Sequence, residues 1–97
     1  MSYYDKDGNT IEREAAWALM DDWDYKRVAR DYIGDVQVST VWLGMDLGFT
    51  GGHPPIIFET MVFGGELDQE TRRYATLDEA KAGHKAVLDE VRQAEAE

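Results

Sequence analysis

Residues 36–65 constrain the fold more than any other part of the chain, because they combine two strand patterns with one long connection. Residues 36–43 alternate β-branched or aromatic side chains with smaller or more polar ones, which is typical of a half-buried strand. Residues 56–63 are again β-branched and aromatic, and the two prolines before them favour an extended backbone. The glycine-rich connection 44–55 is longer than most hairpin loops, and such loops often carry function. The segment predicts two neighbouring strands.

One further strand is predicted on each side of this pair. Residues 27–33 have a period of two. That period places three side chains on one face: Val28, Arg30 and Tyr32. The Gly-Asp pair at 34–35 is typical of a two-residue hairpin, because glycine adopts a positive φ without strain. Such a turn pairs Ile33 with Val36, Asp31 with Val38 and Ala29 with Thr40. Residues 70–75 are more polar and predict an edge strand.

A first helix is predicted before the strands, over residues 10–20. Asn9 can cap it, and Glu12 lies three residues on, as in a capping box. Its apolar residues recur at helical spacing, whereas Trp17 lies off that stripe. Trp17 therefore either covers a neighbouring loop or stands on the surface, where a partner can use it.

A second helix is predicted over residues 77–93, after the last strand. Thr76 and Glu79 have the spacing of a capping box. His84 lies within the apolar stripe of this helix, which favours a core histidine over a catalytic one. Gly83 costs about 1 kcal/mol relative to alanine inside a helix, so we expect a strand or a tryptophan to approach it closely.

The whole chain, residues 1–97, is predicted to form one small α+β domain. We expect a four-stranded antiparallel meander sheet, with an N-terminal and a C-terminal helix packed on one face, because both apolar stripes need a surface to cover. The chain has no cysteine, which excludes disulfides and thiolate metal sites. It shows no signal-peptide pattern and no run approaching the roughly 20 apolar residues of a membrane helix.

The charge is unusual, since twenty acids and ten bases give a formal net charge of −10. Direct binding of nucleic acid depends largely on neutralising phosphates with Lys and Arg, so we expect none. A protein with a basic surface would instead be attracted to this chain. The alternative is that the acidity only keeps a small protein in solution.

Catalytic and metal-binding patterns are weak. The hydroxyls of Ser39 and Thr40 lie mid-strand, without the sharp turn that exposes a hydrolase nucleophile. A small metal-dependent hydrolytic enzyme using the loop around 44–59 is an alternative, with Asp46, His53 and Glu59 as its ligands. Against it, Glu59 can pair with an arginine of the next strand. We expect a protein that is not an enzyme, with no cofactor and no metal.

Aromatic residues are the better indication of function, because exposed tryptophan and tyrosine anchor many protein interfaces. They outnumber what one covered sheet face requires, although the 44–55 loop can cover some of them. The candidate partner-binding residues are Trp17, Trp23, Trp42, Asp46, Phe49 and His53.

Four segments resemble a family of small bacteriophage and prophage proteins, especially from phages of actinobacteria. They are 39–44 (STVWLG), Asp46, 54–65 (PPIIFETMVFGG) and 73–76 (RYAT). The resemblance covers roughly residues 25–91, and its run 54–65 is the most specific. The family has no established activity, so the resemblance implies a context: expression in the cytoplasm of an infected bacterium. Members of the family often have histidine directly after the aspartate, where this chain has Leu47, which weakens a shared metal site unless His53 replaces it.

These observations together favour a non-catalytic phage accessory protein that binds a host protein. Its sharpest form is an acidic inhibitor of a host nucleic-acid-binding or defence protein. A virion-associated or self-associating structural protein, such as a homodimer, is the competing non-enzymatic interpretation.

Overall fold

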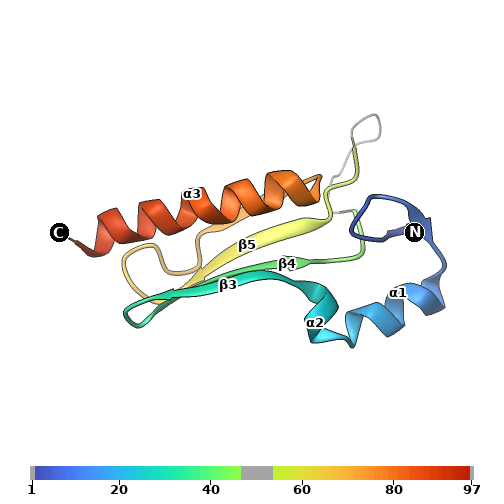
Figure 1. Cartoon of the computed structure of the whole chain (residues 1–97), viewed down its shortest axis with the longest axis horizontal. Helices are drawn as coiled ribbons and strands as arrows, with labels where there is room; N and C mark the ends of the chain where they lie inside the picture. The colour runs from blue at the N-terminus through green and yellow to red at the C-terminus, as the bar shows by residue number, and fades with distance from the viewer. Residues whose placement is uncertain (1, 47–53, 97) are drawn as a thin grey trace.

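Four strands form one antiparallel sheet in the computed structural model, which describes residues 2–46 and 54–96 (Figure 1). The strands are β3 (Arg27–Ile33), β4 (Val36–Trp42), β5 (Phe58–Phe63) and β6 (Thr71–Tyr74), and they lie side by side in chain order. The predicted α+β class and meander topology are confirmed. β5 and β6 are shorter than predicted, since they begin at Phe58 and Thr71.

The hairpin between β3 and β4 has the predicted register. Ile33 pairs with Val36, and Gly34 adopts a φ of 58°, as its tight turn requires. The one departure is a bulge between Arg27 and Ala29, which inserts Val28 as an extra residue. Val28 consequently packs against the core, so the prediction that it shares a face with the exposed Arg30 and Tyr32 is wrong.

Helix α3 (Leu77–Glu95) lies along one face of the sheet and contacts all four strands (Figure 1). The predicted capping box is present: the hydroxyl of Thr76 accepts from the Glu79 N–H at 3.1 Å, while the Glu79 carboxylate accepts from the Thr76 N–H at 3.1 Å. The helix buries an apolar stripe against the strands. One core cluster consists of Val36, Val38, Val62, Val87, Leu88 and Val91.

Gly83 lies where α3 passes β6. A close approach by a strand was predicted here, because glycine is otherwise unfavourable within a helix. A Cβ atom at this position would lie 2.2 Å from the ring of Tyr74. The absent side chain therefore allows the tyrosine to pack against the helix backbone, and this contact offsets the low helix propensity of glycine.

The N-terminal region differs from the prediction of one helix from residue 10. Thr10–Ile11 forms a short strand, β2, that pairs with β1 (Tyr3–Tyr4). Asn9 does not cap a helix, because a strand and not a helix follows it; its N–H donates to the Asp5 carboxylate at 2.9 Å in the turn between the two strands. The predicted start of the first helix is wrong: α1 spans Arg13–Met20, and its N-cap Glu12 makes no side-chain capping bond.

A second short helix, α2 (Trp23–Lys26), follows α1 and leads into β3. Asp22 caps it by accepting from the N–H groups of Asp24 and Tyr25. Leu19 and Met20 of α1 pack against a second core cluster, formed by Trp42, Ile57, Phe58 and Ala80 at one end of the sheet. Among the described residues no helix combines the length and the apolar composition that crossing a bilayer requires.

Candidate functional site

The face of the sheet opposite α3 carries a hollow of about 560 Å³. Side chains alternate between the two faces of a strand, so the residues between the buried ones point away from the helix. Strand register arranges them in rows across the sheet, such as Arg30, Ser39 and Met61. The hollow is lined by Trp23, Arg27, Arg30, Gln37, Ser39, Val41, Glu59, Met61 and Phe63.

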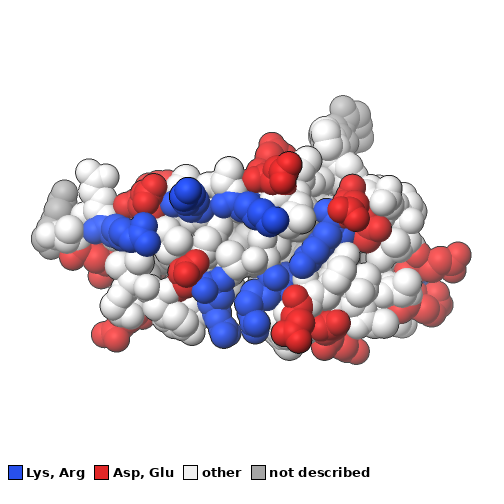
Figure 2. All heavy atoms as spheres, in the orientation of Figure 1, with Lys and Arg blue, Asp and Glu red and all other residues white. Residues whose placement is uncertain are grey.

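The charges around this hollow are predominantly positive, in contrast to the chain as a whole. Glu59 forms an ion pair with Arg73, whose Nε lies 3.1 Å from the Glu59 carboxylate. Within residues 2–46 and 54–96, Arg27 forms an ion pair with Asp24 alone, at 4.0 Å, and no carboxylate forms an ion pair with Arg30. Figure 2 shows Lys and Arg side chains along β3, and Asp and Glu side chains beyond them where Figure 1 has α2 and α1.

The α1–α2 end of the molecule has the opposite character. Residues 12–24 hold five acids and one base, and all five acids are exposed: Glu12, Glu14, Asp21, Asp22 and Asp24. Trp17 is 53% exposed and Trp23 is 59% exposed. Helical spacing places Glu14, Trp17 and Asp21 on one side of α1. Two large exposed rings therefore lie in a segment rich in carboxylates, and each has a cation over its face: Arg13 lies 5.2 Å from the centre of the Trp17 ring and Lys26 lies 4.2 Å from that of Trp23.

Trp42 is a predicted partner-binding residue that the structure places elsewhere. Its side chain is 0% exposed, its indole N–H donates to the carbonyl oxygen of Tyr4 at 2.9 Å, and its ring packs edge-on against Tyr25. The prediction that it contacts a partner is wrong, because the register turns it towards α3 and the N-terminal segment covers it. Tyr32, on the opposite face, is the exposed aromatic of this hairpin.

The remaining predicted residues lie in or beside the 44–55 connection. Asp46 is exposed, and its carboxylate accepts from the Ile56 N–H at 2.8 Å. Phe49 and His53 lie outside the described residues. The metal-site alternative joins His53 to Asp46 and Glu59, so it stays a prediction. Within the part of the chain that is described, no three acidic or histidine side chains form a metal-binding group.

A buried polar chain between α3 and the sheet was missed by sequence reasoning. His84 lies 2.8 Å from the carboxylate of Asp31 through Nε2, and 2.7 Å from the hydroxyl of Thr40 through Nδ1. The Thr40 hydroxyl is also hydrogen-bonded to that of Thr60. His84 is buried, as its place in the apolar stripe predicted. Asp31 is 53 positions away along the chain, so no local pattern could have identified it.

The order carboxylate, imidazole, hydroxyl also occurs in hydrolases that use a serine or threonine nucleophile. Here the Thr40 side chain is 0% exposed, and a substrate cannot reach its hydroxyl. The chain of hydrogen bonds instead satisfies polar groups that would be costly to leave unpaired in the core. It therefore supports the packing of α3 on the sheet.

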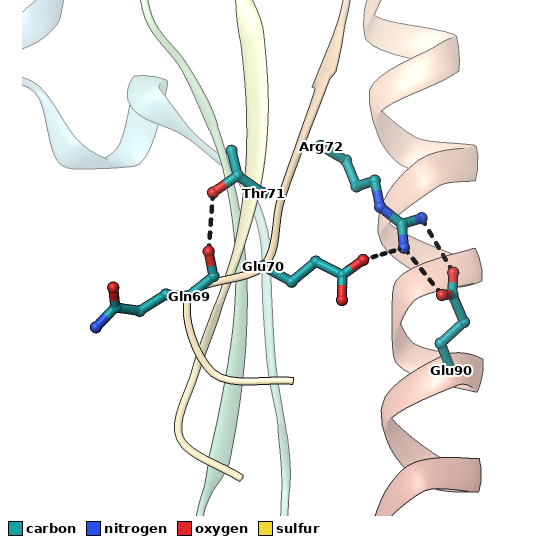
Figure 3. Close-up of polar contacts among 5 residues, drawn as sticks. All are labelled: Gln69, Glu70, Thr71, Arg72 and Glu90. Atoms are coloured by element: carbon teal, nitrogen blue, oxygen red, sulfur yellow. Dashed lines mark hydrogen bonds and ion pairs between the residues drawn. The ribbon is translucent and has the colours of Figure 1, made fainter. Parts of the chain in front are cut away.

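Charged side chains also join α3 to the edge strand β6. Figure 3 shows Arg72 reaching Glu90, to whose two carboxylate oxygens it donates at 3.1 and 2.9 Å, and Glu70, to which it donates at 2.5 Å. Hydrogen bonds from Arg72 lower the pKa of Glu90 below its ordinary value of 4.5. The same bonds raise the pKa of Arg72. These residues stabilise the helix–strand contact.

Comparison of the chain with protein-family models, with curated proteins and with solved structures finds no match.

Proposed function

We propose that this chain is a non-catalytic bacteriophage accessory protein that binds a basic surface of a host protein through its α1–α2 end. The observation that carries the proposal is the pair of exposed tryptophans, Trp17 and Trp23, among the exposed carboxylates of residues 12–24. The phage context and the cytoplasm of the infected bacterium rest on the family resemblance described above.

The two kinds of side chain have different roles in such a complex. A net charge of −10 speeds encounter with a basic surface, and this effect weakens as salt is added. Buried tryptophan anchors then slow dissociation, because the centre of an interface excludes water. Figure 2 shows Asp and Glu side chains grouped at the end of the molecule where Figure 1 has α1 and α2.

The partner class follows from this chemistry. Host nucleases, DNA-binding regulators and defence complexes expose basic surfaces where they hold nucleic acid. A compact acidic end with aromatic anchors would compete for such a surface. The protein would then act as an inhibitor.

Affinity capture from host lysate tests the proposal. Tagged protein is expected to retain a nucleic-acid-binding host protein, with more retained at low salt than at high salt. The double variant Glu14→Gln, Asp21→Asn removes two charges beside Trp17 and is expected to reduce capture, as is Trp17→Ala. The matched control Asp35→Asn, Asp89→Asn removes the same charge elsewhere and should retain the partner.

Two results would count against the proposal. One is equal capture by the Trp17→Ala variant and the unaltered protein. The other is recovery of the protein only inside virus particles, which would favour the structural alternative.

A further inference from the structure

We propose that the hollow on the uncovered sheet face is a binding site for a small anionic ligand that carries a flat aromatic ring, with a nucleotide as the representative of that class. The site adjoins the acidic α1–α2 surface and shares Trp23 with it, but its charged lining residues are two arginines and Glu59, whose carboxylate pairs with Arg73. Its volume of about 560 Å³ falls within the range of about 300–1,000 Å³ that is usual for small-molecule sites.

The anionic part of the ligand is indicated by two arginines on β3. The bulge at Val28 leaves Arg27 and Arg30 on the same side of the sheet, both lining the hollow. Asp24, the partner of Arg27, lies at 4.0 Å and has a side chain that is 98% exposed, so it neutralises the guanidinium weakly. Arg30 has no ion-pair partner in the described part of the chain.

The one carboxylate among the described lining residues does not cancel these charges. Glu59 is 3.1 Å from Arg73 and is itself only 17% exposed. In residues 2–46 and 54–96, the only ion pair made by these two guanidinium groups is the one between Arg27 and the exposed Asp24 at 4.0 Å. Guanidinium groups bind phosphate and carboxylate oxygens through paired, parallel hydrogen bonds.

The aromatic part of the ligand is indicated by the other lining residues. Trp23 presents an exposed indole, and the ammonium group of Lys26 lies 4.2 Å from the centre of its ring. Val41, Met61 and Phe63 supply an apolar surface in the same hollow. Bases stack on aromatic side chains because every base presents a π face.

The acidic residues near the hollow favour a small ligand over a nucleic-acid strand. A nucleic-acid strand would extend beyond the hollow towards the acids of residues 12–24, which would repel its phosphates. A single nucleotide carries few phosphate charges and, of the acids in residues 12–24, lies near Asp24, which pairs with Arg27, so it meets less of this repulsion. Charges beyond about 10 Å are screened at about 0.1 M salt. The structure therefore favours a small ligand over a strand.

An NMR titration of the ¹⁵N-labelled protein tests the proposal with AMP, adenosine and inorganic phosphate as probes. AMP is expected to shift the backbone amides of Ser39, Val41 and Met61, and to bind at least about tenfold more tightly than either adenosine or phosphate. No shift at these amides up to millimolar AMP would overturn the proposal. Equal binding of phosphate and AMP would overturn the aromatic requirement and with it the proposed ligand class.

Variants then locate the site. Arg30→Gln is expected to weaken AMP binding by about tenfold, because a charge-assisted hydrogen bond is lost from an exposed residue that the fold does not need. Arg92→Gln on α3 removes an exposed arginine outside the hollow and should leave the affinity unchanged. The same loss in both variants would mean that AMP responds only to total charge and would overturn the site. Tighter binding of a single-stranded oligonucleotide than of AMP would overturn the size argument.

Discussion

The hydroxyl of Thr40 is the central group of the buried polar chain, because it contacts both His84 and Thr60. Hydrogen positions on the imidazole and on both hydroxyls can adjust together along this chain. Loss of the Thr40 hydroxyl would leave both His84 Nδ1 and the Thr60 hydroxyl without this partner, whereas loss of the Thr60 hydroxyl would leave Thr40 still bonded to His84. The two threonines are therefore unequal in their contribution to stability.

Replacement of each threonine by valine should reveal this difference. Thr40→Val is expected to lower the free energy of unfolding by about 2 kcal/mol, because it leaves buried polar groups unpaired, and Thr60→Val by about 1 kcal/mol, because it removes one hydrogen bond and leaves Thr40 paired with His84. Chemical denaturation measures both values. Thr71→Val is the control, because its hydroxyl donates only to the carbonyl oxygen of Gln69 on the surface. A larger loss at Thr60 than at Thr40 would contradict the geometry.

At the scale of elements, α3 is tied to the sheet by different interactions along its length. The capping box forms at its first turn, and Tyr74 of β6 packs against its backbone at Gly83. Nearer its C-terminus, Glu90 accepts hydrogen bonds from Arg72 of β6. The Arg72–Glu90 pair is roughly half exposed, so water and salt screen it. Its contribution depends on the charge of the carboxylate.

The pH dependence of stability tests this helix–strand contact. Because Arg72 lowers the pKa of Glu90 in the folded state, the pair contributes stability above the ordinary pKa of 4.5 and loses it as the pH falls through the lower folded value. Glu90→Gln is therefore expected to be less stable than the unaltered protein by up to about 1 kcal/mol above pH 4.5. The difference should begin to close as the pH falls below 4.5 and should vanish once the pH lies below the lowered pKa of Glu90 in the folded state.

Denaturation curves at a series of pH values measure the difference between these two proteins. Glu14→Gln is the control, since Glu14 makes no ion pair in the described part of the chain. A difference for Glu90→Gln that persists unchanged at acid pH would show that the substitution acts through packing rather than charge.

At the scale of the whole molecule, the net charge of −10 is spread over a body whose longest extent is 46 Å. At about 0.01 M salt the Debye length is about 30 Å, so carboxylates on different elements repel one another; at about 0.1 M it falls to about 10 Å. Self-repulsion of this kind destabilises the folded state.

Thermal unfolding at the two salt concentrations tests this balance. The Tm is expected to rise from about 0.01 M to about 0.1 M NaCl, because screening relieves more repulsion than attraction when acids outnumber bases. The variant Glu14→Gln, Asp21→Asn carries two fewer negative charges and should show a smaller rise. A fall in Tm with added salt would mean that the ion pairs outweigh the repulsion.

The sequence by itself determined the features that depend on near neighbours in the chain. The two-residue turn at Gly34 set the register of β3 and β4, and the pair Thr76 and Glu79 set the start of α3. Periodicity determined the meander of four strands, because alternation follows directly from strand geometry. These contacts span a few residues, so their patterns are readable in one dimension.

Only the tertiary structure decided which side chains meet across long separations. The sequence could not say which sheet face α3 covers, and this choice buried Trp42 and left Arg30 and Tyr32 exposed. The same packing brought Asp31 to His84, 53 positions along the chain. The pairing of β1 with β2, where a longer helix was predicted, is also a choice that the local pattern did not reveal. The physical reason is that burial and long-range pairing depend on the packing of complete elements, whereas propensity and capping act within a single turn.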